Sequence, residues 1–344
     1  MNGRWKIFIT ALIFLLAVNG SYAGQMKKTA QTAMKWLSIP VGARAISLGT
    51  ANFCNSGSAG DLFWNPAGTA SIESPQLFLS HMQWIADVSL EAAAAAIPIG
   101  GTGVVSVSAR AVNYGTLMGT QFVDSNAEIF QLTGEFSPSS YQFGVGFAQH
   151  VTDRFSYGVH LSYARESLGN AVISEFDQSR ADARSEATSM SLLYLDFGVV
   201  YYTGFHDLRV GMTLQNFSQD KGYADVNNPI PMDIRMSMAM DMIPVVNELL
   251  GMSGSGGFNH KFTLSVDASH PRDYSERMHV GAEYIFQDFI ALRTGYKFNY
   301  DEESVAFGAG LMKSIAGKKL AIDYAYLPFG IFDSVNTFTF TLNF

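Results

Sequence analysis

The last eight residues of the chain, Thr337-Phe338-Thr339-Phe340-Thr341-Leu342-Asn343-Phe344, alternate strictly between polar and apolar side chains. Successive side chains of a β-strand point to opposite faces, so this alternation predicts a strand with one apolar and one polar face. The same two-residue period recurs at many places, for example over residues 155–164, 208–215, 233–242 and 290–300. The predicted fold class is therefore all-β.

The length of these segments separates two all-β classes. Several segments run to about ten residues, whereas the usual strand of a soluble protein has about five or six. A tilted strand that crosses a membrane needs about 9–11 residues. Aromatic residues also gather at strand ends, as in the outward row from Ile290 to Tyr300, and a membrane barrel carries such girdles at both interfaces. The pattern favours a transmembrane antiparallel β-barrel, with a secreted β-sandwich as the alternative.

Composition narrows the class further. Of the 344 residues, 48% are hydrophobic and only 15% are charged, against about 25% charged residues in soluble domains. The formal net charge of −8 argues against a nucleic-acid partner, which needs a basic face. A single cysteine excludes a disulfide scaffold and a cysteine-based metal site.

The first 23 residues look like a targeting segment. Arg4 and Lys6 precede an apolar run over residues 7–18, and small residues follow at Ser21 and Ala23. This order predicts a secretory signal peptide, residues 1–23, cleaved after Ala23. The alternative, a membrane anchor, is disfavoured because twelve apolar residues are too few to cross a bilayer as a helix. Residues 24–74 show no alternation and are predicted to form a separate segment ahead of a barrel over residues 75–344.

Counting the alternating segments gives fifteen candidate strands, but single-chain bacterial barrels close with an even number. We therefore assign residues 115–139 to one long outer loop with some strand character, which leaves about fourteen strands. Residues 166–188 and 217–231 are predicted to be the other long outer loops. The connection over 243–259 falls on the opposite side, with a short helix expected near residues 245–250.

Charged side chains occupy the face that would point into the lumen. In the lipid, an Arg or Lys at the bilayer midplane would cost about 2–4 kcal/mol. We expect these groups to pair with one another and with the N-terminal segment, where Arg44 and Asp61 are natural partners. The alternative is a functional role, in which the lumen charges hold an N-terminal segment that can shift. The inward set is Arg110, Arg209, Asp233, Arg235, Asp241, Asp267, Glu283, Arg293, Lys297 and Asp323.

Two runs carry a resemblance to a known family. Gly42-Ala43-Arg44-Ala45, followed by Trp64-Asn65-Pro66-Ala67-Gly68, resembles the N-terminal signature of the PorV/PorQ family of FadL-like outer-membrane barrels. The glycine- and aromatic-rich runs over 281–284, 291–297, 307–310 and 322–326 are similar to that family too. The resemblance implies a fourteen-stranded barrel whose residues 24–74 plug the lumen. The plug motif would comprise Gly42, Arg44, Asp61, Trp64, Asn65, Pro66 and Gly68.

The resemblance also implies a location and partners. It implies the outer membrane of a diderm bacterium, with outer-membrane lipid and the barrel assembly machinery as partners. The terminal Phe344 resembles the aromatic residue that this machinery recognises. A role in type IX protein secretion would add secreted cargo proteins or components of the secretion complex as partners.

Three functions follow as hypotheses. Cargo binding in type IX secretion predicts exposed apolar residues in the outer loops, such as Leu117, Met118, Phe122 and Val123. A FadL-like channel for hydrophobic small molecules predicts an apolar pocket lined by Phe53, Phe63 and Trp64.

An enzyme, such as a lipase, is the third and least favoured hypothesis. The chain has no HExxH or Gly-x-Ser-x-Gly motif. His160 and Ser162 share one strand face, but any two residues at that spacing do. We therefore expect no catalytic residue, metal or cofactor.

Overall fold

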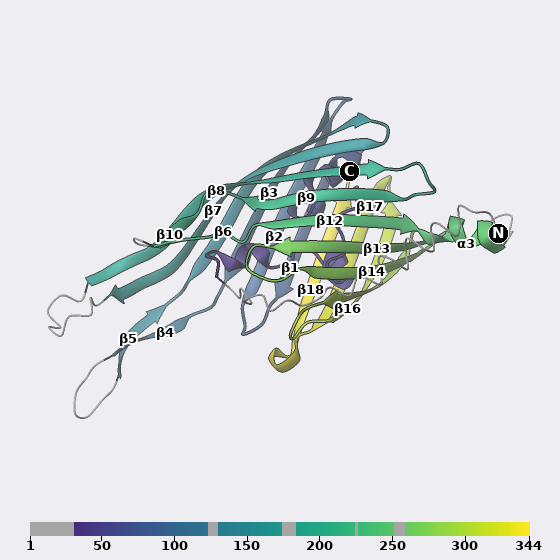
Figure 1. Ribbon diagram of the computed structural model, residues 1–344. Coiled ribbons are helices and arrows are strands. Elements are labelled where there is room, and N and C mark those ends of the chain that lie inside the picture. Colours follow the sequence, from purple (N-terminus) through teal and green to yellow (C-terminus); the bar gives the residue numbers. More distant parts are fainter. Residues whose placement is uncertain (1–30, 123–129, 174–183, 224–225, 251–258) are drawn as a thin grey trace.

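The computed structural model describes residues 31–122, 130–173, 184–223, 226–250 and 259–344. Fourteen antiparallel strands form a closed barrel, in which the first strand pairs with the last (Figure 1). This confirms the predicted fold class and strand count. The barrel strands are β1 (Gln76–Gln83), β2 (Ser89–Ile99), β3 (Gly103–Asn113), β6 (Ser139–Thr152), β7 (Phe155–Ile173), β8 (Arg184–Tyr202), β9 (Arg209–Phe217), β12 (Asp233–Asp241), β13 (His260–Pro271), β14 (Arg277–Phe286), β15 (Ile290–Phe298), β16 (Val305–Ile315), β17 (Lys318–Pro328) and β18 (Ser334–Asn343).

Alternation sorts each strand into an inward and an outward face. In β15 the inward Arg293 and Lys297 are buried, while the outward Leu292 is 56% exposed on the barrel surface. Exposed apolar side chains also cover the outside of β6, β8 and β16, for example Phe143, Leu193 and Phe307. A surface of this kind suits contact with lipid rather than with water.

Two residues expected on the outward face lie elsewhere. Tyr300 does not continue the outward row of β15, because Asn299 has a φ of 63° and turns the chain after the strand ends. The Tyr300 ring instead packs at 5.6 Å from the ring of the inward His279. Met242 does not end the outward row of β12, because it begins the helix α3 (Met242–Leu250).

The two ends of the barrel differ. At the long-loop end, β4 (Leu117–Phe122) and β5 (Phe130–Phe136) form a separate hairpin, as predicted for residues 115–139, and β10 (Lys221–Tyr223) pairs with β11 (Val226–Asn228). The loop expected over 166–188 is largely strand, because β7 and β8 stay paired as far as Ile173 and Arg184. Beyond the membrane such a hairpin needs no apolar face, so alternation did not reveal it. The short-turn end carries the tight connections and α3, the helix expected after residue 242.

The described part of the N-terminal segment contacts the inward faces of the strands. It contains four short helices, η1 (Lys35–Ser38), α2 (Ala43–Ser47), η2 (Ala59–Phe63) and η3 (Pro66–Ser71). The sequence explains two of these starts. Ser58 and Asp61 form a capping box before η2, and Asn65 caps η3 with Pro66 at its first position. A further short helix, η5 (Gly330–Phe332), lies between β17 and β18.

Glycines in the strands let this segment approach the wall closely. A Cβ atom added at Gly295 of β15 would lie 2.0 Å from the backbone nitrogen of Gly49. A Cβ atom at Gly158 of β7 would lie 2.3 Å from the carbonyl carbon of Pro66. Real Cβ atoms do not approach other atoms so closely, so only glycine fits at these positions.

Among the described residues, no helix has the length and hydropathy needed to cross a membrane.

The terminal residue closes the last strand. The Phe344 backbone N–H donates to the Pro75 carbonyl oxygen at 2.9 Å, and Lys318 Nζ lies 4.9 Å from the centre of the half-exposed Phe344 ring. A cation–π contact of this kind at an exposed site contributes about 0.5–1 kcal/mol to stability.

We expect deletion of Phe344 to reduce the amount of assembled barrel severalfold, measured as heat-modifiable protein in outer membranes. The thermal stability of the assembled fraction should change little. Normal assembly after the deletion would contradict the role of Phe344 as an assembly signal.

Candidate functional site

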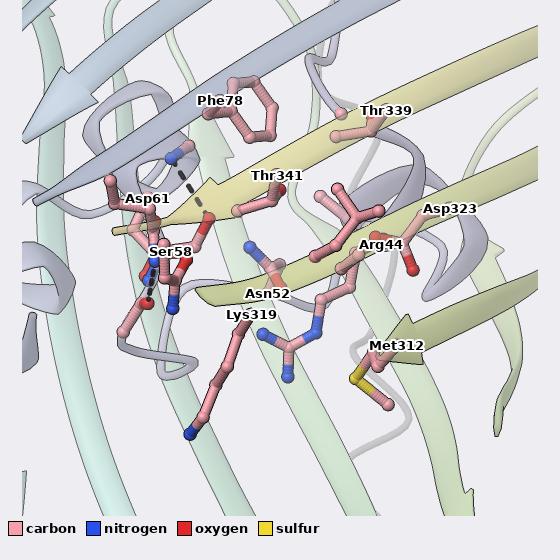
Figure 2. A pocket seen from close by; sticks show the side chains of 18 of the residues that line it. Arg44, Asn52, Ser58, Asp61, Phe78, Met312, Lys319, Asp323, Thr339 and Thr341 are labelled. Atoms are coloured by element: carbon pink, nitrogen blue, oxygen red, sulfur yellow. Dashed lines mark hydrogen bonds between the residues drawn. The ribbon is translucent and has the colours of Figure 1, made fainter. Parts of the chain in front are cut away.

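The candidate site is the lumen, where a cavity lies at each end and Trp64 lines both. The short-turn cavity has a volume of about 450 Å³, and Figure 2 shows Arg44, Asp61, Lys319 and Asp323 around it. The long-loop cavity has a volume of about 710 Å³. The N-terminal segment contributes residues to both linings, so its attachment to the wall determines the shape of the lumen.

Three buried charges and the partly exposed Arg44 tie α2 to the wall at the short-turn end. Arg44 binds Glu283 through two hydrogen bonds, Nε to Oε1 at 2.9 Å and Nη2 to Oε2 at 2.8 Å. Arg293 Nε also donates to Glu283 Oε1 at 2.6 Å, and Arg293 Nη1 donates to Asp323 Oδ1 at 2.6 Å. Bidentate pairs of this kind fix orientation as well as charge. The network joins α2 to β14, β15 and β17.

Trp64 and Asn65 form a second attachment. Asn65 Nδ2 donates to the carbonyl oxygens of Phe53, at 2.8 Å, and Val199 of β8, at 3.2 Å. Its Oδ1 accepts from the Ala67 N–H at 3.0 Å, which caps η3. Trp64 Nε1 donates to the Val41 carbonyl oxygen at 2.8 Å. One amide side chain thus holds two parts of the segment and the wall together.

Two glycines of the plug motif occupy positions where a side chain would be strained or would clash. Gly42 has a φ of 89°, in the left-handed region that favours glycine, and precedes α2. A Cβ at Gly68 would lie 2.9 Å from the Asn55 carbonyl oxygen.

The other inward charges have varied partners. Arg209 donates to Asp207 and to Asn55 of the N-terminal segment, and Asp267 accepts from the Phe53 N–H at 3.2 Å. Toward the long-loop end, Arg235 pairs with Asp233 and Lys297 pairs with Glu303. At the short-turn end, Asp241 accepts from the N–H groups of Ile243 in α3 and Phe262 in β13. Arg110 donates to the Leu37 carbonyl oxygen at 3.3 Å and lies over the Trp36 ring.

Asp61 differs from the expectation that it pairs with a lumen cation. Its Oδ2 accepts from the Ser58 N–H at 2.9 Å, because the two residues form a capping box within the segment. Burial raises the pKa of the Asp61 carboxyl to about 7, which the Ser58 hydrogen bond and the nearby Arg44 charge only partly oppose.

This pKa predicts a pH dependence. A carboxyl with a raised folded-state pKa binds its proton more tightly in the folded protein. Its contribution to stability is therefore complete below about pH 4 and is lost as the pH rises through about 7. We expect the midpoint of thermal unfolding to be higher at pH 5 than at pH 8, and Asp61→Asn to shrink that difference. An unchanged difference in Asp61→Asn would assign the pH dependence to other groups.

Phe53, Phe63 and Trp64, expected to line an apolar pocket, pack against one another in a hydrophobic cluster instead. Phe53 is fully buried and its ring packs edge-on at 5.3 Å from the Trp64 ring. Of the three residues, only Trp64 lines the two cavities described above. Both cavities are instead bordered by many charged side chains.

A buried polar cluster was missed by the sequence analysis. His160 Nδ1 lies 2.9 Å from Asp196 Oδ2, while His160 Nε2 lies 2.9 Å from Ser108 Oγ and 3.0 Å from Ser162 Oγ. The order Ser–His–Asp resembles a catalytic triad, but each member is buried and none lines either cavity. The cluster therefore holds the wall strands together. The only signal in the sequence is that alternation places all four side chains on the lumen face of their strands.

Among the described residues, no group of three or more His, Cys, Asp or Glu side chains is placed so that it could hold a metal ion.

Solved structures share this architecture. The chain is similar to the Ralstonia pickettii toluene transporter TbuX (TM-score 0.53, 13% identity, 88% of this chain and 96% of that chain). It is also similar to a Pseudomonas aeruginosa FadL homologue (0.51, 10%, 88% and 98%) and to the Pseudomonas putida toluene transporter TodX (0.53, 10%, 87% and 96%). At these identities the likeness shows the fold alone, a closed antiparallel β-barrel.

A comparison of the sequence with known families identifies the family of this chain. Residues 62–328 match the family described as type IX secretion system membrane protein PorP/SprF, and the chain belongs to this family. The match confirms the link to type IX secretion and to the outer membrane, whereas the specific resemblance to PorV/PorQ is not confirmed. No curated protein matches the chain.

Proposed function

We propose that this barrel is a non-enzymatic component of type IX secretion that binds secreted cargo proteins or other secretion components at its long-loop end. In this proposal residues 24–74 plug the lumen, so the barrel acts as a binding platform and not as an open pore. The observation that carries it is the attachment of the N-terminal segment to the wall at Arg44, at Asn65 and at the wall glycines.

The charges in the lumen favour binding over conduction of hydrophobic compounds. Buried charges are costly unless they are paired, and an apolar ligand offers them no hydrogen bonds. The Arg44–Glu283–Arg293 network borders the short-turn cavity, so a hydrocarbon would have to pass these groups. The FadL-like channel for hydrophobic small molecules remains the alternative, and the names of two structural neighbours suggest it.

The hairpins at the long-loop end offer the binding surface. The β4–β5 hairpin projects beyond the wall (Figure 1), and Leu117, Met118 and Leu132 on it are exposed. Apolar side chains that are exposed outside the lipid commonly mark contacts with other proteins. Val123, also expected to contribute, lies outside the described residues.

The test compares two matched double variants in the native organism. Leu117→Glu with Met118→Glu changes the β4–β5 hairpin, while Leu249→Glu with Leu250→Glu changes two even more exposed leucines on α3 at the other end. We expect the first variant, assembled at normal amounts, to lose secretion of type IX cargo into the medium, and the second to retain it. Loss only in the α3 variant would contradict the assignment to the long-loop end. Intact secretion after deletion of the whole gene, with lost uptake of toluene, would support the channel.

A further inference from the structure

We propose that the long-loop cavity is a binding site for a neutral saccharide, a role independent of the proposed secretion function. Its volume of about 710 Å³ falls in the range of small-molecule sites. The lining comes from η1, the β1–β2 connection and the loop-side ends of β3 and β12 to β15. Strands and the N-terminal segment thus build the cavity together.

Aromatic side chains form much of its wall. Trp36, Trp64, Trp84, Tyr114, Tyr274 and Tyr300 all line it. The chain has four tryptophans, and the three that follow the predicted signal peptide all lie here. Tyr and Trp combine an apolar ring face with a polar edge. A sugar ring has the matching surface, with apolar C–H faces and hydroxyl groups around its rim.

The charged side chains of the lining are mostly paired. Lys35 Nζ lies 2.6 Å from Asp273, Arg235 Nε 2.7 Å from Asp233, and Lys297 Nζ 2.6 Å from Glu303. Four cationic and four anionic residues line the cavity: Lys35, Arg235, Arg277 and Lys297 against Glu166, Asp233, Asp273 and Glu303. A cavity of balanced charge does not favour a polyanion. An apolar ligand would leave these groups desolvated without hydrogen bonds.

Unpartnered polar atoms remain at this site. In the described part of the chain, Trp36 Nε1, Arg235 Nη1 and Asp273 Oδ1 are buried and have no hydrogen-bond partner. Trp36 is 4% exposed and Asp273 is 2% exposed. Two of the atoms are donors and one is an acceptor. A hydroxyl group can serve both kinds, because it donates one hydrogen bond and accepts two. These atoms are shielded from solvent in the structure, so a neutral, polyhydroxylated ligand would satisfy them only after the lining side chains turn toward it.

Arg277 provides the most specific contact to test. Its guanidinium lies 4.0 Å from the ring centres of both Tyr274 and Tyr300, and no salt bridge to it is found among the described residues. Arg272 is a suitable control, because it is exposed, pairs with Asp220 and does not line the cavity.

The experiment uses the tryptophan fluorescence of the full-length processed protein, since all its tryptophans line the cavity. The protein is held in a detergent without a sugar headgroup and titrated with neutral hexasaccharides of glucose, mannose and N-acetylglucosamine. Hexagalacturonate and toluene serve as the anionic and the apolar probe. We expect a saturable change in emission with at least one neutral hexasaccharide. Arg277→Gln should weaken it about tenfold or more, and Arg272→Gln should leave it unchanged.

A second variant tests the site independently, in case Arg277→Gln fails to fold. Trp36→Phe keeps an aromatic ring but removes the unpartnered N–H together with the five-membered ring of the indole, so we expect binding about five- to tenfold weaker with an unchanged barrel in heat-modifiability assays. Saturation by toluene or hexagalacturonate but by no neutral saccharide would overturn the proposal. So would the absence of any response, or equal binding by Arg277→Gln and Arg272→Gln.

Discussion

Gly295→Val should detach the N-terminal segment from the barrel wall. A Cβ at this position would lie 2.0 Å from both the Gly49 nitrogen and the Leu48 carbonyl carbon. Both atoms belong to the backbone, so no side chain can rotate to relieve the clash. Overpacking of a tight contact typically costs about 1–3 kcal/mol, and the clash of a Cβ with backbone atoms that cannot rotate away costs more. The segment should therefore leave its site while the strands, which pair through their backbones, remain closed.

Limited proteolysis measures this release. In the Gly295→Val variant, residues 31–75 should become cleavable while the barrel still migrates as a heat-modifiable species. Gly100→Val is the matched control, because nothing lies within 4 Å of a Cβ at Gly100. Equal protection of the segment in both variants would mean that the close approach at Gly295 does not hold it.

Glu283→Gln should cause the largest loss of stability among single charge changes. Glu283 accepts from both Arg44 and Arg293, and its side chain is almost fully buried. Removing its charge leaves two guanidinium groups close together without their shared anion. Breaking a buried pair in this way costs about 3–5 kcal/mol. Loss of the Arg44 contact should also loosen α2 from the wall.

Thermal unfolding followed by heat-modifiable migration tests this prediction. Glu276→Gln is a suitable control, since Glu276 pairs with His270 at 3.3 Å but both side chains are exposed. Exposed pairs contribute about 0–1 kcal/mol, so the control should unfold near the wild-type temperature. A Glu283→Gln variant as stable as the control would show that the network is not needed to hold the segment.

Alternation in the sequence was enough to predict the barrel and the inward side of charges such as Glu283 and Arg293. The strand number also needed the even-number rule for closed barrels, which reduced fifteen candidate strands to fourteen. A strand in lipid must keep its apolar residues on one face, which makes the pattern strict. The partner of each charge could not be predicted, because it depends on the register between strands and on where the N-terminal segment lies. Asp61 illustrates this, since a local capping hydrogen bond took the place of a distant ion pair.

Where the chain leaves the lipid, alternation no longer predicts the direction of a side chain or the extent of a strand. Tyr300 keeps the outward parity of β15, but a left-handed Asn299 turns it inward. The long β7–β8 hairpin continues through polar and small residues without regular alternation. The cluster of Ser108, His160 and Asp196 needed the pairing of three separate strands, which no local motif encodes.

Conductance in planar lipid bilayers tests the central claim, a lumen closed by its N-terminal segment, most directly. The purified full-length processed protein and a variant that lacks residues 24–70 should be compared at the same number of inserted barrels. The account predicts near-zero conductance for the full-length protein and discrete open-channel currents for the shortened one. Equal, near-zero conductance in both would contradict it, because the lumen would then be closed by the side chains of the barrel itself.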